Sequence, residues 1–329
     1  MKLLLIGGGA FLGRALLDAA CAAGHAVTVF NRGRRRRDWP PGVEWIEGDR
    51  RQDLARLAGR HWDAVADTCG YLPPEVAASA AALRGCGRYL FVSSVSAYAA
   101  LDRPGLDETA ALASAASVAP DDADLAHYGA QKAACEAAVQ AVFGDRSQVV
   151  RPGLIVGPGD PTGRASHWPW RLAEGGRTVA PDAPAATLQC IDVRDLAAWM
   201  LRLLERPGGG CWNATGPSIG WADWLAACAA AVRAQGGTPA EVVAVPEAAL
   251  EAAGVAPWSG LPLWIPSTAP NAAGFMAVSR ARALADGLVT RPAADTAADI
   301  LRLDPAGPGD PRRAGRISAA QEAALLGRD

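Results

Sequence analysis

Tyr128 and Lys132 are the residues of this chain best suited to acid–base chemistry. The chain has 4 tyrosines and only two lysines, Lys2 being the other, and it uses arginine almost everywhere it needs a positive charge. A lysine here indicates a role that arginine cannot fill, because lysine is a compact point charge whose pKa can move. On a helix, positions i and i+4 share one face, so the Lys132 ammonium can favour the phenolate form of Tyr128. The alternative is an ordinary pair on a helix surface.

A run of glycines at residues 7–9 is the second informative feature. An apolar run at residues 3–6 precedes it, helical apolar spacing follows at residues 11–23, and residues 26–30 are again apolar. A dinucleotide binds in this context of strand, glycine turn, helix and strand, because the turn lets the backbone approach the pyrophosphate and the helix N-terminus offers free N–H groups. A turn that only connects the elements is the alternative.

The same alternation continues along the chain and predicts an α/β fold. Further strands are expected at residues 43–46, 64–67, 89–92 and 149–150, and a helix carrying the Tyr/Lys pair at residues 125–143. We expect a doubly wound parallel Rossmann sheet in residues 1–155, completed by segments near 187–215. Residues 156–186 and 216–329 are expected to form a smaller C-terminal substrate lobe and a tail.

Ser93 and Ser94 directly follow the strand expected at residues 89–92. In a doubly wound sheet, ligands bind at the carboxyl ends of the strands, so both serines are expected near the Tyr/Lys pair. We expect Ser94 to hold the carbonyl or hydroxyl oxygen of a substrate, with Ser93 as its less favoured substitute. The alternative for a serine at a strand end is a structural cap.

Several motifs together give the chain a resemblance to the short-chain dehydrogenase/reductase family, in its extended branch of nucleotide-sugar epimerases and related reductases. The motifs lie at residues 7–13, 48–49, 91–98, 128–132, 151–153, 157–158 and 191–195. The extended branch usually has Gly-x-x-Gly-x-x-Gly, whereas Ala10 stands at the middle position here. The resulting pattern is similar to a reductase-like subgroup, near which lie chloroplast stem-loop RNA-binding proteins of the same fold.

The resemblance implies that Tyr128 is the general acid/base, that Lys132 also binds the nicotinamide ribose, and that Ser94 positions the substrate. The implied reaction is hydride transfer at a carbonyl or hydroxyl carbon of a small molecule. Dehydratases of this branch usually carry an acidic pair after the serine or threonine, but Val95 and Ser96 follow here. This argues against a dehydratase and leaves two hypotheses for the enzyme: an oxidoreductase, or an epimerase that keeps its NAD bound. A non-catalytic RNA-binding protein is a third hypothesis.

The residues after the second expected strand bear on the choice of cofactor. NAD sites commonly have Asp or Glu there, whereas Asn31 and Arg32 follow here. Because Arg32 can pair with a 2′-phosphate, NADP(H) is favoured and NAD(H) is the alternative. Residues 34–37 are expected to be a solvated loop. The expected cofactor contacts, with Asp49 at the adenine, are Gly7, Gly9, Ala10, Phe11, Leu12, Gly13, Asn31, Arg32, Asp49, Arg50, Thr68, Gly70, Ser93, Tyr128, Lys132, Pro152, Gly153 and Leu154.

The residues expected to contact the substrate are Tyr71, Ser96, His167 and Trp168. The last two follow a flexible Gly/Pro-rich stretch at residues 157–163, which suits a substrate-facing loop. Trp258 and Trp264, between prolines, are a further expected wall. The alternative is that the tryptophans only pack the core of the lobe. Residues 305–329 are expected either to pack on the lobe or to extend freely.

Composition limits the remaining possibilities. A formal net charge of −2 does not mark a nucleic-acid binder, which disfavours the RNA-binding hypothesis. The 7 cysteines are scattered without a Cys-x-x-Cys pair, which argues for reduced thiols in a cytoplasmic protein and against a zinc site, so no metal is expected. No stretch is long and apolar enough to span a membrane. Helices at residues 73–83 and 125–143 could pair across a two-fold axis to form a homodimer.

Overall fold

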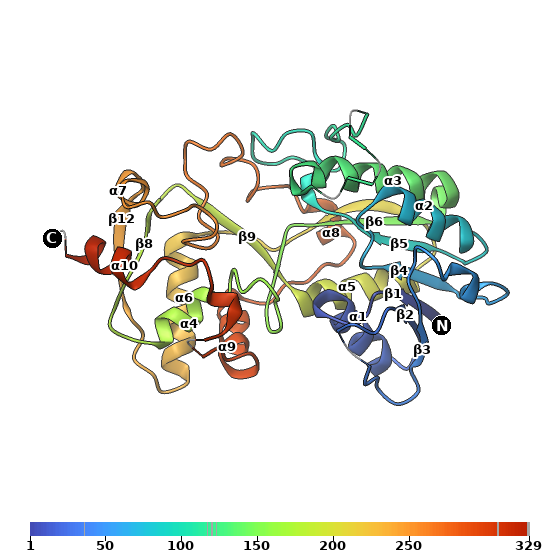
Figure 1. Ribbon diagram of the computed structural model, residues 1–329, viewed down its shortest axis with the longest axis horizontal. Helices are drawn as coiled ribbons and strands as arrows, with labels where there is room; N and C mark the ends of the chain where they lie inside the picture. Colours follow the sequence, from blue (N-terminus) through green and yellow to red (C-terminus); the bar gives the residue numbers. More distant parts are fainter. Residues whose placement is uncertain (36, 117, 120, 123, 308, 328–329) are drawn as a thin grey trace.

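A seven-stranded parallel sheet forms the centre of one half of the molecule in the computed structural model (Figure 1). Its strands are β1 (Lys2–Ile6), β2 (Ala26–Asn31), β3 (Glu44–Glu47), β4 (Ala64–Asp67), β5 (Tyr89–Val92), β6 (Ser147–Pro152) and β10 (Gly210–Ala214). Their spatial order is β10-β6-β5-β4-β1-β2-β3, and neighbouring strands run parallel. The structure describes residues 1–35, 37–116, 118–119, 121–122, 124–307 and 309–327, so Arg36 of the expected solvated loop and residues 308, 328 and 329 of the tail lie outside the described residues.

Helices cover both faces of this sheet. They are α1 (Phe11–Ala22), α2 (Pro73–Ala82), α3 (Tyr128–Phe143) and α5 (Val193–Glu205). Figure 1 shows α1 and α5 on one face and α2 and α3 on the other. Side chains alternate along β1, so Leu3 and Leu5 join the core under α1 and α5, whereas Leu4 and Ile6 join the opposite core. Burial on both faces explains the continuous apolar runs of these strands.

The strand order reverses between β1 and β4. From β1 the chain builds β2 and β3 outward on one side, and it then returns to build β4, β5 and β6 on the other. At such a switch point, a crevice for a ligand forms at the carboxyl ends of the strands. The predicted fold class, a doubly wound parallel sheet, is therefore confirmed.

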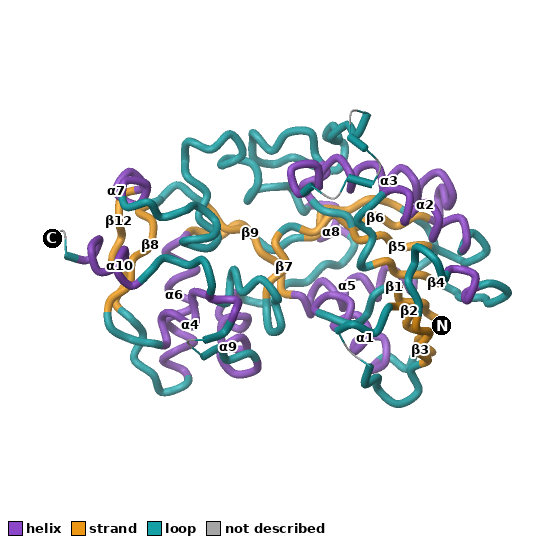
Figure 2. Tube along the Cα trace, in the orientation of Figure 1, coloured by secondary structure: helices purple, strands orange, loops and turns teal. Residues whose placement is uncertain are grey.

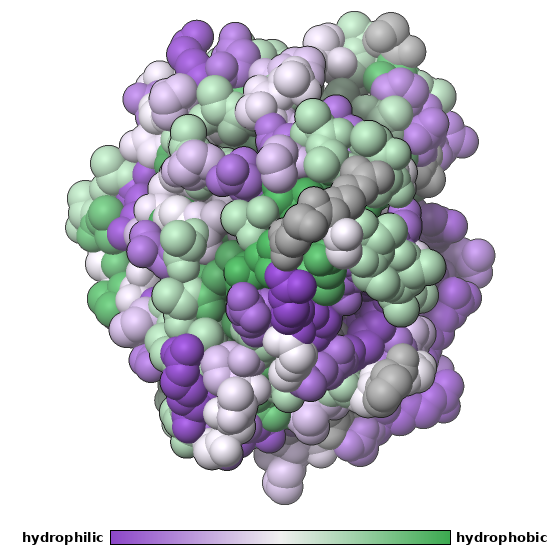
Figure 3. Space-filling view, turned by 90° about the vertical axis from the view of Figure 1, so that its left-hand side faces the viewer, coloured by the Kyte–Doolittle hydropathy of each residue, from purple (hydrophilic) through white to green (hydrophobic). Residues whose placement is uncertain are grey.

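The C-terminal lobe contains two small sheets. One consists of β7 (Leu154–Val156), β9 (Thr187–Asp192) and β11 (Ser218–Gly220), and the other of β8 (Arg177–Asp182) and β12 (Glu241–Pro246). Its helices are α4 (His167–Ala173), α6 (Trp221–Ala234), α7 (Glu247–Ala252), α9 (Ala293–Leu303) and α10 (Ala319–Leu326), while α8 (Ala281–Ala285) contacts β10. Figure 2 shows the lobe beside the large sheet, with β7 and β9 between them. The outer end of the lobe mixes hydrophilic and hydrophobic residues (Figure 3).

Tryptophans fill the core of this lobe. Trp168, Trp221, Trp224 and Trp264 are all buried in one cluster. The rings of Trp168 and Trp221 meet edge to face, with centroids 5.2 Å apart. Because large aromatic rings bury much apolar surface, they give a small lobe a core of its own.

Segments near 187–215 were expected to complete the large sheet, but only β10 enters it, because β9 pairs with β7 and β11. For the tail, the sequence left two courses open. The tail packs on the lobe over its described residues: the Thr178 hydroxyl donates to Glu322 of α10 at 2.6 Å. Short 3₁₀ turns connect other elements at Leu54–Leu57, Val95–Ala97, Leu125–His127, Gly144–Arg146 and Pro311–Arg313. In the part of the chain that the structure describes, no helix has the length and hydrophobicity needed to cross a membrane.

Candidate active site

A cavity of about 930 Å³ lies at the carboxyl ends of the parallel strands and extends to the lobe. One end is formed by the glycine turn after β1 and the residues that follow β2. The other end is formed by the start of α3, by Asp160, Pro161, Thr162 and Arg164, and by Trp258 and Phe275 of the lobe. The cavity therefore joins the place expected for a dinucleotide to a place where a second molecule can bind.

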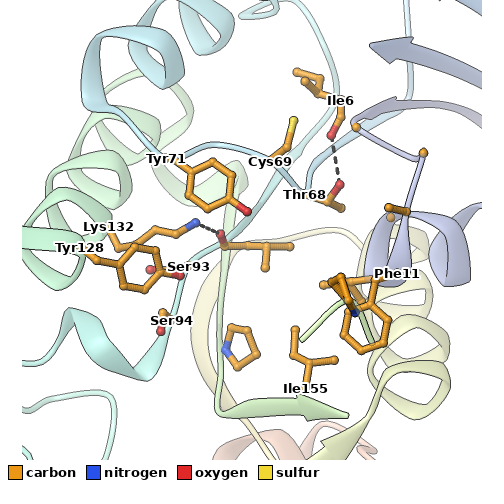
Figure 4. A pocket seen from close by; sticks show the side chains of 18 of the residues that line it. Ile6, Phe11, Thr68, Cys69, Tyr71, Ser93, Ser94, Tyr128, Lys132 and Ile155 are labelled. Atoms are coloured by element: carbon orange, nitrogen blue, oxygen red, sulfur yellow. Dashed lines mark hydrogen bonds between the residues drawn. The ribbon is translucent and has the colours of Figure 1, made fainter. Parts of the chain in front are cut away.

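Ser94, Tyr128 and Lys132 lie together on one wall of this cavity (Figure 4). Tyr128 begins α3, and Lys132 follows one turn later on the same helix. Ser94 comes directly after β5, where its hydroxyl accepts a hydrogen bond from the Ser96 N–H at 3.0 Å. Ser94 is thus a structural cap and also lines the cavity. Phe11 and Ile155 lie across the cavity from these residues (Figure 4).

Burial sets the protonation of Tyr128. It raises the pKa of the phenol to about 12, and nearby Tyr71 adds to this increase, whereas the Ser94 hydroxyl and the Arg164 cation act in the opposite direction. The phenol is therefore protonated at neutral pH and can donate a proton. The cation that opposes the shift is Arg164, which the sequence had not indicated.

The ammonium of Lys132 is buried and held by backbone oxygens. Its Nζ donates to the carbonyl oxygens of Gly70 and Val92, both at 2.7 Å, and lies 5.9 Å from the centre of the Tyr128 ring. Burial lowers the pKa of Lys132 to about 8. An arginine could not take this place in the same way, because its forked guanidinium is larger and its pKa does not fall to this range. Gly70 itself does not line the cavity but lies behind Lys132.

The turn after β1 requires glycine and offers N–H groups. Gly7 has φ +116°, and a Cβ added there would lie 2.4 Å from the Thr68 hydroxyl oxygen. A Cβ on Gly13 would lie 2.7 Å from the backbone nitrogen of Gly8. The first turn of α1 has no acidic residue, and Ala10 provides no side-chain cap. The N–H groups at this helix end can therefore bind the pyrophosphate of a dinucleotide.

The residues after β2 present arginine rather than a carboxylate. Asn31 is occupied: its amide donates to the Gly7 carbonyl, and its Oδ1 accepts hydrogen bonds from the Gly33 N–H at 2.9 Å and from Trp45 at 3.2 Å. Arg32 is half exposed, and its Nη1 lies 3.6 Å from Asp49 Oδ2. Asn31 thus fixes the turn, while Arg32 is free to reorient toward an anionic group.

Arg50 and Ser93 border the cavity, but their side chains are engaged elsewhere. The Arg50 guanidinium donates to both carboxylate oxygens of the buried Asp67, at 3.0 and 2.7 Å, and to the Ser79 hydroxyl. The carboxylate at the end of β4 thus holds the Arg50 guanidinium, while the predicted contact of Arg50 with the cofactor stays a prediction. The Ser93 hydroxyl donates to Glu136 of α3, so it is not available to a substrate as Ser94 is.

The prediction that His167 and Trp168 face the substrate was wrong. Both are buried in α4 and neither lines the cavity. Trp168 donates its Nε1–H to the Pro262 carbonyl at 2.9 Å, and the His167 ring packs against its edge. Burial, together with nearby arginines, lowers the pKa of His167 to about 3. The α4 helix thus turns these aromatic side chains toward the core of the lobe and away from the cavity. Trp264, which was expected to form a second wall, is also buried in this core.

The other predicted residues line the cavity: Gly7, Gly9, Ala10, Phe11, Leu12, Gly13, Asn31, Arg32, Asp49, Thr68, Tyr71, Ser96, Pro152, Gly153 and Leu154. So does Trp258, the tryptophan of the second expected wall. Sequence reasoning missed Asp160, Arg164 and Phe275, which also line it. The first two lie in or next to the Gly/Pro-rich stretch that was expected to face the substrate. That stretch was therefore the available signal, whereas the predicted contacts His167 and Trp168 lie further along the chain.

Part of the chain is similar in sequence to known proteins. Residues 73–214, which include Ser94, Tyr128 and Lys132, match the NAD dependent epimerase/dehydratase family. The 2′-dehydrokanamycin reductase of Streptomyces kanamyceticus is 28% identical over 214 residues, which are 62% of this chain and 58% of that protein.

Two solved structures share the fold. The Bordetella bronchiseptica enzyme WbmH in complex with NAD+ has a TM-score of 0.65 at 16% identity, covering 91% of this chain and 96% of WbmH. The UDP-glucose 4-epimerase of Thermus thermophilus, in complex with NAD, has a TM-score of 0.63 at 17% identity, covering 92% of this chain and 98% of the epimerase. These structures confirm the fold that the resemblance to the extended short-chain dehydrogenase/reductases implied. The match to the NAD dependent epimerase/dehydratase family covers residues 73–214, which are less than half of the chain.

Proposed function

We propose that the protein is an NAD(P)-dependent oxidoreductase that transfers a hydride at a carbonyl or hydroxyl carbon of a small molecule. The observation that carries this proposal is the grouping of Ser94, Tyr128 and Lys132 on one wall of a cavity that begins at the glycine turn. A nicotinamide supplies or accepts the hydride when it is bound. The chain's own residues must hold the substrate oxygen and move a proton to or from it.

Each residue of the group has a role that its position supports. Tyr128, protonated at neutral pH, donates a proton to the substrate oxygen during reduction. Ser94 lies on the same wall and orients that oxygen by a hydrogen bond. Lys132 lies one turn below the phenol and provides a positive charge when protonated. In the direction of oxidation, this charge and that of an oxidised nicotinamide favour the phenolate, which offsets the effect of burial.

We further propose a preference for NADP(H), with NAD(H) as the alternative. No carboxylate follows β2, where a ribose 2′-hydroxyl would need one, and Arg32, Arg34 and Arg35 line this end of the cavity. Arg32 can leave its long contact with Asp49 to pair with a 2′-phosphate. Asp49 is then positioned near the adenine.

The second candidate function is an epimerase that retains NAD and returns the hydride to the same substrate. The solved structures that share this fold include a UDP-glucose 4-epimerase, which favours this candidate, whereas the relative matched by sequence is a reductase. The absorbance of the purified protein separates the two, because an epimerase keeps its nicotinamide through purification.

RNA binding without catalysis is disfavoured because the catalytic group is intact. A homodimer through α2 and α3 and a cytoplasmic location stay predictions.

Replacing Tyr128 with Phe tests the oxidoreductase proposal. Ketones and aldehydes are screened with NADPH, and turnover of any active compound is expected to fall roughly 100-fold or more in the variant, because general acid catalysis is lost. NADPH binding should be unchanged. Tyr98→Phe controls for the loss of a buried tyrosine hydroxyl, since Tyr98 lies outside the cavity, where its hydroxyl donates to Asn213 at 2.7 Å and accepts from Arg151 at 3.1 Å. Full activity of the Tyr128 variant would exclude this role for Tyr128.

A further inference from the structure

Arg164 is a cation on the cavity wall whose charge has no partner in the part of the chain that the structure describes. Its Nε donates to the Thr162 hydroxyl at 2.9 Å, and its guanidinium lies 5.4 Å from the centre of the Trp258 ring. Within the described ranges it forms no ion pair, and no hydrogen bond from its two terminal nitrogens is observed. Stacking on Trp258 fixes the plane of the guanidinium and leaves its terminal N–H groups for a ligand.

Asp160 lies four residues before Arg164 and also lines the cavity, but no ion pair between the two is observed. Its Oδ1 accepts hydrogen bonds from the Thr162 N–H at 2.9 Å and the Thr162 hydroxyl at 2.7 Å. Its Oδ2 is buried and has no partner in the described part of the chain. Burial raises the pKa of this carboxyl, which favours its neutral form. Asp160 therefore shapes the loop and leaves the charge of Arg164 available.

The C-terminal segment holds the loop that carries Arg164. The carboxylate of Asp304 accepts a hydrogen bond from the Gly159 N–H at 2.8 Å. Arg316 donates to the Thr162 carbonyl at 2.9 Å and to the Ser259 carbonyl at 3.1 Å. The contacts of Asp304 with Gly159 and of Arg316 with Thr162 join residues about 150 positions apart in the sequence, and they fix the loop before any ligand binds. This gives the tail a role that the sequence left open.

Arg316 adds a second positive charge near Arg164. Arg316 donates only to carbonyl oxygens in the described chain, and burial together with the Arg164 charge lowers its pKa. Arg164 also acts as a cation on the Tyr128 phenol, so its guanidinium lies within electrostatic range of the proposed reaction centre. An anion placed between Trp258 and Tyr128 would relieve the repulsion between the two arginines.

We propose that Arg164 anchors an anionic oxygen group of the substrate, a carboxylate or a phosphate, and thereby selects acidic compounds for reaction at Tyr128. The anion accepts hydrogen bonds from the terminal N–H groups of Arg164, while the reacting carbonyl or hydroxyl oxygen lies at Tyr128 and Ser94. The inference rests on the proposed function for the position of the reacting carbon. The charge preference itself is a property of binding and does not require turnover.

Isothermal titration calorimetry of the Tyr128→Phe protein with NADPH measures this preference without turnover. The probes are two pairs that differ in charge: phenylpyruvate against its methyl ester, and glucose 6-phosphate against glucose. At least one anion is expected to bind roughly 10- to 100-fold more tightly than its neutral partner, as a charged hydrogen bond requires. The carboxylate and phosphate pairs distinguish the two sources of the anion. The proposal is overturned if neither anion binds more tightly than its partner.

Variants of Arg164 locate the preference. Adding Arg164→Gln should remove the advantage of the anion and leave binding of the neutral partner unchanged, whereas Arg164→Lys should keep part of it. Arg233→Gln is the matched control, since Arg233 is an exposed arginine of α6 that does not line the cavity. An unchanged preference in a folded Arg164→Gln protein overturns the proposal. Full turnover by Tyr128→Phe would instead contradict the proposed function, and the charge preference could still hold.

Discussion

A buried ion pair between Glu136 and Arg151 holds the helix that carries Tyr128 and Lys132, and its removal should be costly. Glu136 and Arg151 are 6% and 4% exposed. Arg151 donates its Nε to Glu136 Oε1 at 2.9 Å and its Nη2 to Oε2 at 2.6 Å, which ties α3 to β6. The Ser93 hydroxyl donates to the same carboxylate and so adds the end of β5 to the contact.

The expected cost follows from the burial of both charges. Glu136→Gln keeps the shape of the side chain but leaves the Arg151 cation buried without a counter-charge, which destabilises a protein by about 3–5 kcal/mol. Arg151→Met should cost a similar amount, because the Glu136 carboxylate is then unpaired. The double variant leaves no unpaired charge, so its loss should be well below the sum of the two single losses.

Urea unfolding of the four proteins measures this cycle, and turnover is measured in parallel. The single variants are expected to lose catalytic activity at temperatures where they are still folded, because α3 no longer holds Tyr128 firmly against Ser94. Additive losses below about 1 kcal/mol each would refute the reasoning, since they would mean that the pair is solvated rather than buried.

Three further outcomes follow from the structure. Gly13→Ala should weaken NADPH binding by roughly tenfold or more, because its Cβ would lie 2.7 Å from the Gly8 nitrogen. Gly85→Ala is the control, since its Cβ would meet nothing within 4 Å. Equal NADPH affinities of the two variants in a fluorescence titration would contradict the assignment of the glycine turn to cofactor binding. Arg32→Glu should lower the affinity for NADPH and spare that for NADH, which comparison of the two dissociation constants checks. Burial lowers the pKa of His167 to about 3. Below about pH 6.5, the unfolded chain therefore binds a proton at His167 that the folded protein does not bind. The folded protein loses stability as the pH falls from about 6.5 toward 3. Between pH 7.5 and pH 4.5, wild type should therefore lose about 2–3 kcal/mol more than His167→Gln in urea unfolding, and equal losses would show that His167 is accessible to protons.

The large sheet was predictable because its signals are local. A strand buried on both faces is a short apolar run, and the run at residues 89–92 is the observed β5. The glycine turn and the pair of Tyr128 and Lys132 are also local patterns, and each carries its geometry within a few residues. The parallel sheet then brings the strand ends together, so Ser94 could be placed near Tyr128 without knowledge of the contacts.

The lobe was not predictable in the same way because long-range contacts shape it. Aromatic residues after a Gly/Pro-rich stretch indicated a cavity wall, but α4 turns His167 and Trp168 into the lobe core. Arg164 faces the cavity because Arg316 and Asp304 hold its loop, and no local pattern encodes such a contact. The ion pair of Arg50 with Asp67 was also not predictable, because the two residues are 17 positions apart and no local sequence pattern pairs them.

A titration of the purified protein with NADPH and, separately, NADH tests the central claim most directly. Energy transfer from the tryptophans to the reduced nicotinamide reports binding and needs no substrate. We predict saturable binding of both nucleotides, or retained nucleotide in the purified sample, with NADPH preferred. Binding of neither nucleotide by a folded sample free of nucleotide would contradict the assignment of the cavity, and with it the proposed chemistry of Tyr128.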